Sequence, residues 1–111
     1  MQYDKLIRDH IPEIIGASGK RAKVETYSEA NFRHALLQKL VEEATEARDA
    51  SPADLATEMA DVLEVIDAVF ATFGLSEPEV RALQTKRQAE RGAFSKRLRL
   101  LQVEADQEPL T

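Results

Sequence analysis

Two pairs of acidic residues occur at helical spacing near the centre of the chain. Glu43 and Glu46 form the first pair, and Glu58 and Asp61 form the second. Residues three apart lie on one face of a helix, so each pair would direct two carboxylates the same way. At about 3.6 residues per turn, Glu43 and Glu58 fall within the apolar stripes of their own segments. The pattern therefore predicts carboxylates on the packed sides of two neighbouring helices.

The stripes that contain these acids are built from regularly spaced apolar residues: Phe32, Leu36, Leu40, Ala44 and Ala47 in the first segment, and Leu55, Met59, Val62, Ile66, Val69 and Phe73 in the second. Burying an unpaired carboxylate is costly, and four neighbouring carboxylates repel one another. A divalent cation bound by all four would remove both costs. Carboxylate ligands favour Mg²⁺, with Mn²⁺ possible. The chain has no cysteine, and His10 and His34 are not at ligand spacing from the acids, which argues against zinc.

A simpler interpretation needs no metal. Glu58 would pair with Lys39 or with an arginine, and the other acids would point into water. The distribution of charge is compatible with either interpretation, because ten acids face three bases between Glu29 and Asp67, whereas six bases face one acid between Lys86 and Arg99. A cation bridging a polyanion would need an acidic centre with basic ends, but solvated helix faces give the same pattern.

Capping residues, proline and glycine indicate the helices that would position these acids. Ser28 is an N-cap, and Ser51 followed by Pro52 at the first helical position marks a second start. Gly74 is a typical helix end, and Ser76 opens a capping box. These signals predict helices over about residues 28–49, 52–73 and 77–92. Because the connections are short, we expect the first two to be antiparallel neighbours.

The ends of the chain give weaker signals. Residues 8–15 around Pro12 are compatible with a short helix. Residues 22–27 alternate weakly, and residues 98–103 are the plausible partner for a two-stranded appendage. The fold class that we predict is all-α, an antiparallel helical bundle, possibly with this small appendage. At 111 residues the chain has the size of one domain, spanning residues 1–111.

Composition narrows the setting in which the protein works. Apolar residues make up 43% and charged residues 32% of the chain, which is typical of a soluble globular protein. The charged start of the sequence does not resemble a signal peptide, and the apolar-rich stretch at residues 62–73 is too short to cross a bilayer. We therefore expect a cytoplasmic protein whose partners include neither a membrane nor a nucleic-acid polymer.

The acidic residues also stand in a recognisable arrangement. Residues 38–46, Gln-Lys-Leu-Val-Glu-Glu-Ala-Thr-Glu, followed by Glu-Met-Ala-Asp at residues 58–61, resemble the signature of the all-alpha nucleoside triphosphate pyrophosphohydrolases. That superfamily includes MazG-like enzymes, dimeric dUTPases and phosphoribosyl-ATP pyrophosphohydrolase. Residues 38–80 resemble the last of these, whereas the flanks at residues 5–15 and 90–97 resemble a MazG-like subgroup.

The resemblance implies roles for particular residues. Metal ligands would be Glu43, Glu46, Glu58 and Asp61, and Glu42 would position or deprotonate the attacking water or hold another ion. A basic group would hold the pyrophosphate leaving group, and the candidates for substrate binding are Lys39, Lys86, Arg91, Lys5 and Arg8. Phe32 and Phe94 could stack on a base, although a core position explains both more simply. The family also implies a homo-oligomer, a dimer or tetramer, with the nucleotide as substrate.

Three functions remain open on these grounds. The first is Mg²⁺-dependent hydrolysis of a nucleoside triphosphate, NTP or dNTP, to the monophosphate and pyrophosphate, which would cleanse the nucleotide pool. The second is phosphoribosyl-ATP hydrolysis in histidine biosynthesis. The third is a non-enzymatic helical dimerisation module that has retained the acidic site, against which the intact set of five acids counts.

Overall fold

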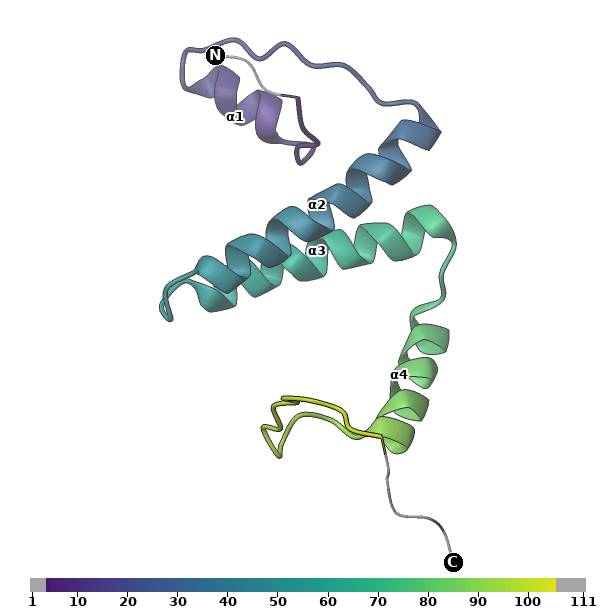
Figure 1. Ribbon diagram of the computed structural model, residues 1–111. Helices are drawn as coiled ribbons and strands as arrows, with labels where there is room; N and C mark the ends of the chain where they lie inside the picture. Colours follow the sequence, from purple (N-terminus) through teal and green to yellow (C-terminus); the bar gives the residue numbers. More distant parts are fainter. Residues whose placement is uncertain (1–3, 106–111) are drawn as a thin grey trace, which may run out of the picture. The chain divides into compact units, whose positions relative to one another are not determined.

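The computed structural model describes residues 4–105, which form four helices and no strand. The chain divides into two compact units, residues 1–77 and 78–111. The first unit contains α1 (Ile11–Ala17), α2 (Glu29–Asp49) and α3 (Leu55–Phe73). Its largest feature is the antiparallel hairpin of α2 and α3 (Figure 1). The all-α fold class is confirmed.

Helix α2 begins where its sequence predicts. The hydroxyl of Ser28 accepts a hydrogen bond from the Asn31 amide at 3.2 Å, which caps the first turn. Its other end leads directly into the tight connection to α3, so the two long helices run in opposite directions. At the far end of the hairpin, the Arg33 guanidinium lies 5.3 Å from the centre of the Phe73 ring. This contact joins the start of α2 to the end of α3.

Helix α3 begins three residues later than the proline signal predicts. Residues 52–54 form a turn, in which the Asp54 amide donates to the Ser51 carbonyl at 3.0 Å. The Ser51 hydroxyl donates to the Asp54 carboxylate at 3.1 Å and so does not cap the helix. The end at Gly74 is confirmed: its φ of 64° is left-handed, and the Leu75 amide reaches back to the Phe70 carbonyl at 2.9 Å.

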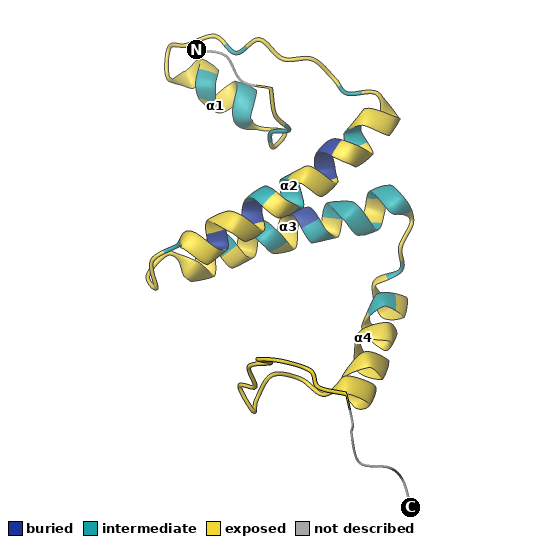
Figure 2. Cartoon of the chain, in the orientation of Figure 1, coloured by how far each residue is buried: buried dark blue, intermediate teal, exposed yellow. Residues whose placement is uncertain are grey.

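The core lies where α2 and α3 face each other (Figure 2). Its buried apolar residues are Ala35, Leu36, Ala47 and Val65. One charged side chain, Glu43, is buried among them, with 8% of its surface exposed. Leu36 and Ala47 confirm the stripe predicted for α2, but Ala44 is exposed.

The predicted stripe of α3 is rotated from the observed one. Leu55 and Met59 are 44% and 47% exposed, whereas Val65 is buried and Glu58 is half-buried. Helix α3 is apolar over a wide arc, so periodicity alone did not determine which part of that arc would face α2. The observed rotation turns the acidic edge of the arc toward the core.

Helix α1 is the short helix predicted around Pro12, although it begins at Ile11 rather than Arg8. Residues 18–28 connect it to α2 without regular structure. The predicted two-stranded appendage is wrong, because neither residues 22–27 nor residues 98–103 adopt strand structure. An isolated two-stranded ribbon is marginal in water, and weak alternation did not supply a packed face to support one.

The second unit contains α4 (Glu77–Arg91), which ends as predicted at Gly92, where φ is 81°. Residues 93–105 follow in irregular structure. Phe94 is 94% exposed, so its predicted place in a core is wrong. None of the described helices is long and apolar enough to cross a membrane.

Candidate metal centre

The α2–α3 hairpin gathers the predicted acidic residues in two groups that share the buried Glu43. Possible ligand atoms of Glu43, Glu58 and Asp61 all lie within 4.8 Å of one another, so both helices contribute. A second group, within the same limit, is formed by Glu42, Glu43 and Glu46 on α2. Glu43 belongs to both groups. Because oxygen ligands lie about 2.0–2.6 Å from Mg²⁺ or Ca²⁺, atoms at such separations can share a cation.

Two oxygen atoms at this centre are buried without a hydrogen-bond partner. They are Oε2 of Glu43 and Oε2 of Glu58. Buried polar atoms are nearly always partnered in folded proteins, and leaving a carboxylate oxygen unsatisfied is costly. A cation that prefers oxygen ligands would satisfy both atoms. The residues present therefore fit a hard divalent cation, which Glu43, Glu58 and Asp61 would hold together.

The electrostatics of Glu43 agree with a site built for positive charge. Burial raises the pKa of Glu43 above its ordinary value of 4.5, and the neighbouring charge of Glu46 raises it further. Lys39 opposes both effects, because its ammonium lies 3.4 Å from Oε1 of Glu43. Without a cation, ionising Glu43 therefore costs more in the folded protein than in the unfolded chain.

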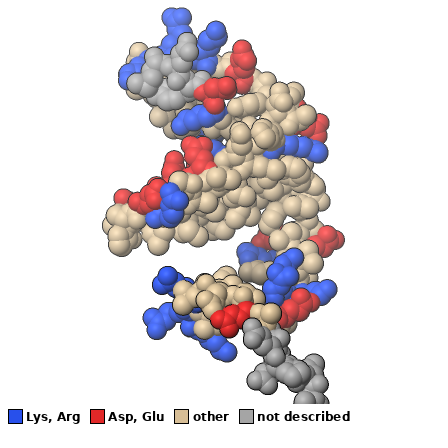
Figure 3. Space-filling model, in the orientation of Figure 1, with Lys and Arg blue, Asp and Glu red and all other residues tan. Residues whose placement is uncertain are grey.

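Two basic side chains form ion pairs with acids of the cluster. Lys39, whose side chain is 16% exposed, lies between Glu43 and Glu42, with its Nζ 3.5 Å from Oε2 of Glu42. Arg8 donates from Nη2 to Oδ1 of Asp61 at 2.8 Å, although 53 positions separate them in the sequence. The cationic partners considered in the metal-free interpretation are therefore present, but they neutralise other acids than Glu58. Acidic and basic side chains lie next to one another over the α2–α3 hairpin (Figure 3).

A cavity of about 180 Å³ lies beside the cluster, between α2 and the lead-in, the segment of residues 4–10 before α1. Lys5, Tyr27, Gln38, Lys39 and Glu42 are among the residues that line it. The cavity shares Lys39 and Glu42 with the acidic cluster, so a ligand in it would reach the carboxylates. Tyr27 was not predicted as a site residue. The sequence offered one signal for it: Tyr27 directly precedes the N-cap Ser28, so the start of α2 fixes where its backbone lies.

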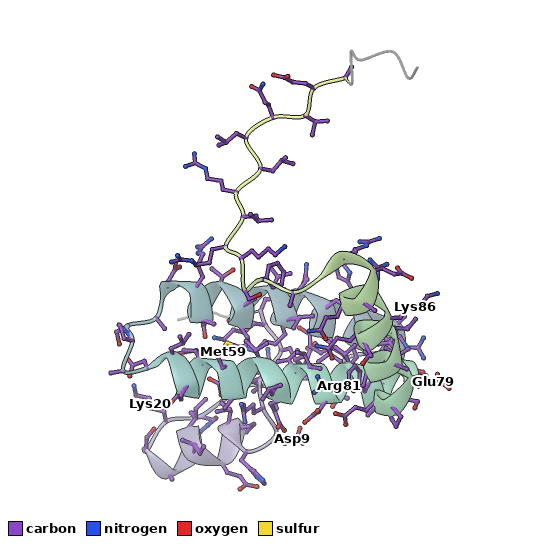
Figure 4. The ribbon with its side chains drawn as sticks, turned by 90° about the horizontal axis from the view of Figure 1, so that it is seen from below. Asp9, Lys20, Met59, Glu79, Arg81 and Lys86 are labelled. Carbon is purple, nitrogen blue, oxygen red and sulfur yellow. The ribbon has the colours of Figure 1, made fainter. Side chains whose placement is uncertain are left out.

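Two of the residues predicted to bind substrate belong to the second unit. Lys86 and Arg91 are exposed on α4, in the second unit, and Lys86 projects outward from its helix (Figure 4). Their role in substrate binding stays a prediction. Phe32 is half-buried, and both histidines are exposed.

The fold and the site together define an all-helical protein with a carboxylate centre inside a two-helix hairpin. The family model of phosphoribosyl-ATP pyrophosphohydrolase matches residues 9–88, which include both acidic pairs. The chain therefore belongs to the phosphoribosyl-ATP pyrophosphohydrolase family.

The comparison with curated proteins gives a relative without an assigned activity. An uncharacterized protein of Mycolicibacterium smegmatis (strain ATCC 700084 / mc(2)155) is 44% identical over 54 residues, or 49% of this chain. Those residues make up 55% of the relative, so the chain spans about half the length of the curated protein that it matches. No solved structure matches the chain.

Proposed function

We propose that the protein hydrolyses the α–β phosphoanhydride bond of a nucleoside triphosphate, an NTP or dNTP, releasing the monophosphate and pyrophosphate. The observation that carries this proposal is the pair of buried, unpartnered oxygens on Glu43 and Glu58. The two residues lie on two helices and belong to one group of possible metal ligands, in a family whose description names a pyrophosphohydrolase. Clustered carboxylates repel the phosphates of a nucleotide. A cation between them removes this repulsion and lets the substrate bind at the centre.

The acids have separate tasks in this proposal. Glu43, Glu58 and Asp61 hold the cation, which we propose is Mg²⁺, with Mn²⁺ as a substitute, and we propose that Glu46, which is grouped with Glu43, joins them as a fourth ligand. When bound, the ion supplies charge neutralisation for the phosphates and a lowered pKa for a coordinated water. Glu42 lies at the edge of the cluster with its side chain 37% exposed, so it is open to solvent on one side. We assign to Glu42 the proton that the attacking water loses, which it then passes to solvent.

The bases hold the phosphates. Lys39 touches two of the acids and also lines the neighbouring cavity, as does Lys5. An ammonium at that position attracts a phosphate chain that would otherwise be repelled by the carboxylates. We therefore propose that the leaving pyrophosphate binds toward the cavity. The water that breaks the anhydride bond supplies one proton to Glu42, and its oxygen remains on the monophosphate.

A second candidate is phosphoribosyl-ATP hydrolysis, which the description of the family model favours. The nucleoside triphosphate is our first choice because the lead-in of the MazG-like subgroup, which this sequence resembles, reaches the acidic centre through Arg8. The same acids and bases would serve either substrate. The two substrates differ in the phosphoribosyl group, which phosphoribosyl-ATP carries and a nucleoside triphosphate lacks.

A panel of nucleotides tests the proposal. The purified protein would be assayed for pyrophosphate release from each NTP and dNTP and from phosphoribosyl-ATP, with Mg²⁺ and with a chelator. We expect Mg²⁺-dependent release from at least one triphosphate and none with the chelator. Turnover of phosphoribosyl-ATP alone would assign the second function. No release from any substrate would refute hydrolysis and leave a non-enzymatic module.

A further inference from the structure

The Arg8–Asp61 ion pair joins two segments that differ in secondary structure. Asp61 is on α3 and belongs to the group that can hold a cation. Arg8 is in the lead-in before α1, where residues 6–8 have no regular structure, and its side chain is 57% exposed. One partner is thus fixed by a long helix, and the other is carried by irregular chain.

The pair has a consequence for cation binding. A divalent cation at Asp61 would lie close to the guanidinium of Arg8, because that guanidinium is 2.8 Å from Oδ1 of the same carboxylate. Like charges at such distances repel strongly, more so beside a partly buried cluster than in water. Arg8 and the cation therefore compete for Asp61.

The two basic residues of the cluster differ in their freedom to withdraw. The Lys39 side chain is 16% exposed and is held on α2 by two acids. It also leaves Oε2 of Glu43 open, so it does not occupy the place of the cation. Arg8 contacts the cluster through its ion pair with Asp61 and has an exposed side chain, so it can leave Asp61 at little structural cost. Of the two, Arg8 is the residue that can move.

We propose that Arg8 is a place-holder that neutralises Asp61 until a divalent cation arrives and then transfers to a phosphate oxygen of the substrate. This inference rests on the proposed function. A guanidinium suits the exchange because its planar N–H groups bind carboxylate and phosphate oxygens in the same geometry. The exchange keeps the positive charge at the centre, while the acceptor changes from Asp61 to the incoming phosphate. No bond is made or broken in it.

The exchange gives Arg8→Gln two effects of opposite direction. Removing the competitor should strengthen binding of Mn²⁺ or Mg²⁺ alone by about threefold or more. Removing the phosphate ligand should weaken binding of inorganic pyrophosphate to the cation-loaded protein by about tenfold or more. Both affinities can be measured by titration calorimetry, without turnover. The Arg8→Lys variant, which retains the charge, should bind the cation like the parent.

Arg33→Gln is the matched control. It also removes an arginine–carboxylate pair, Arg33 with Glu29 at 3.2 Å, but one outside the acidic cluster. We expect it to leave both affinities unchanged. A second readout is amide hydrogen exchange of residues 4–10. The cation alone should increase exchange there by releasing Arg8, and pyrophosphate added to the loaded protein should decrease it again.

Three outcomes would overturn the inference. Weaker cation binding by Arg8→Gln would make Arg8 a residue that orients Asp61 as a ligand. Unchanged affinities would make the contact an ordinary surface ion pair, and equal changes in Arg33→Gln would show a general effect of charge. If the parent protein binds a cation and releases pyrophosphate in any of these cases, the proposed function stands. If the parent binds no cation, the proposed function fails together with the inference.

Discussion

Glu43 is the one charged residue that is buried in the described part of the chain. One of its oxygens faces Lys39 at 3.4 Å, and the other is buried without a partner. Helical periodicity was sufficient to predict this residue, because Glu43 falls inside the stripe of Leu36 and Ala47. The partners of the acids could be predicted only in part. Lys39 lies three and four residues from Glu42 and Glu43, but nothing local pointed from Arg8 to Asp61.

The raised pKa of Glu43 predicts a pH dependence of stability in metal-free buffer. Between the ordinary value of 4.5 and the raised value, the folded protein binds more protons than the unfolded chain. The contribution of Glu43 is therefore complete below 4.5 and is lost as the pH rises through the raised pKa. Glu43→Gln cannot titrate, so the parent should lose stability relative to this variant as the pH rises.

Thermal unfolding of both proteins in chelator, from about pH 4 to pH 8, would measure the effect. Parallel curves over the whole range would contradict it. Adding Mg²⁺ near neutral pH should raise the unfolding temperature of the parent, because ligands bind in their deprotonated form and only the folded protein presents them together.

At the scale of the elements, the sequence determines the helices more closely than their rotations. Ser28 and Gly74 mark helix ends that local chemistry alone can set, and both were predicted correctly. The start of α3 was not, because the Ser51 hydroxyl bonds to the Asp54 side chain and a tight turn precedes the helix. The rotation of α3 about its axis depends on how its surface packs against α2, and the sequence of α3 alone does not determine that packing.

The end of α3 provides a prediction that isolates backbone conformation. A Cβ at Gly74 or at Gly16 would meet no atom within 4 Å, but Gly74 has a φ of 64° whereas Gly16 lies inside α1. Gly74→Ala should destabilise the protein by roughly 1–2 kcal/mol, the cost of the left-handed conformation. Gly16→Ala should be neutral or stabilise by up to about 1 kcal/mol.

Chemical denaturation of the two variants and the parent compares them directly. Since both substitutions add the same methyl group to open space, an equal loss of stability at the two sites would show that φ is not the cause. The left-handed conformation at the end of α3 would then not require glycine at position 74.

At the scale of the whole molecule, the α2–α3 hairpin leaves several large apolar side chains exposed to solvent. Large side chains more than 40% exposed recur every fourth residue on each helix: Leu37 and Val41 on α2, and Leu55, Met59 and Leu63 on α3. Contiguous apolar surface of this kind marks interaction sites in folded proteins. The family resemblance of the sequence also implied a homo-oligomer.

We predict at least a homodimer in solution that buries these residues. Light scattering at micromolar concentration should give a multiple of the chain mass of 12.4 kDa. Val41→Ser and Leu63→Ser together should shift the protein toward the monomer while leaving its helical content unchanged. A monomeric parent would refute the prediction.

The central claim is that particular acids, and not acidity in general, form the functional site. Glu43 and Asp61 belong to one group of possible ligands, whereas Asp49 is exposed and pairs with Arg48 at 2.9 Å. Replacing any of the three by its amide removes one negative charge. The comparison therefore separates the site from the surrounding charge.

The decisive measurement is Mg²⁺-dependent pyrophosphate release by the parent, Glu43→Gln, Asp61→Asn and Asp49→Asn, with the best nucleotide from the panel. We expect Glu43→Gln and Asp61→Asn to lose at least about 100-fold while remaining folded, because each removes a ligand whose geometry the others depend on. Asp49→Asn should stay within a few-fold of the parent. Equal and small effects at all three positions would contradict the account and make the acidic cluster a solvated helix surface.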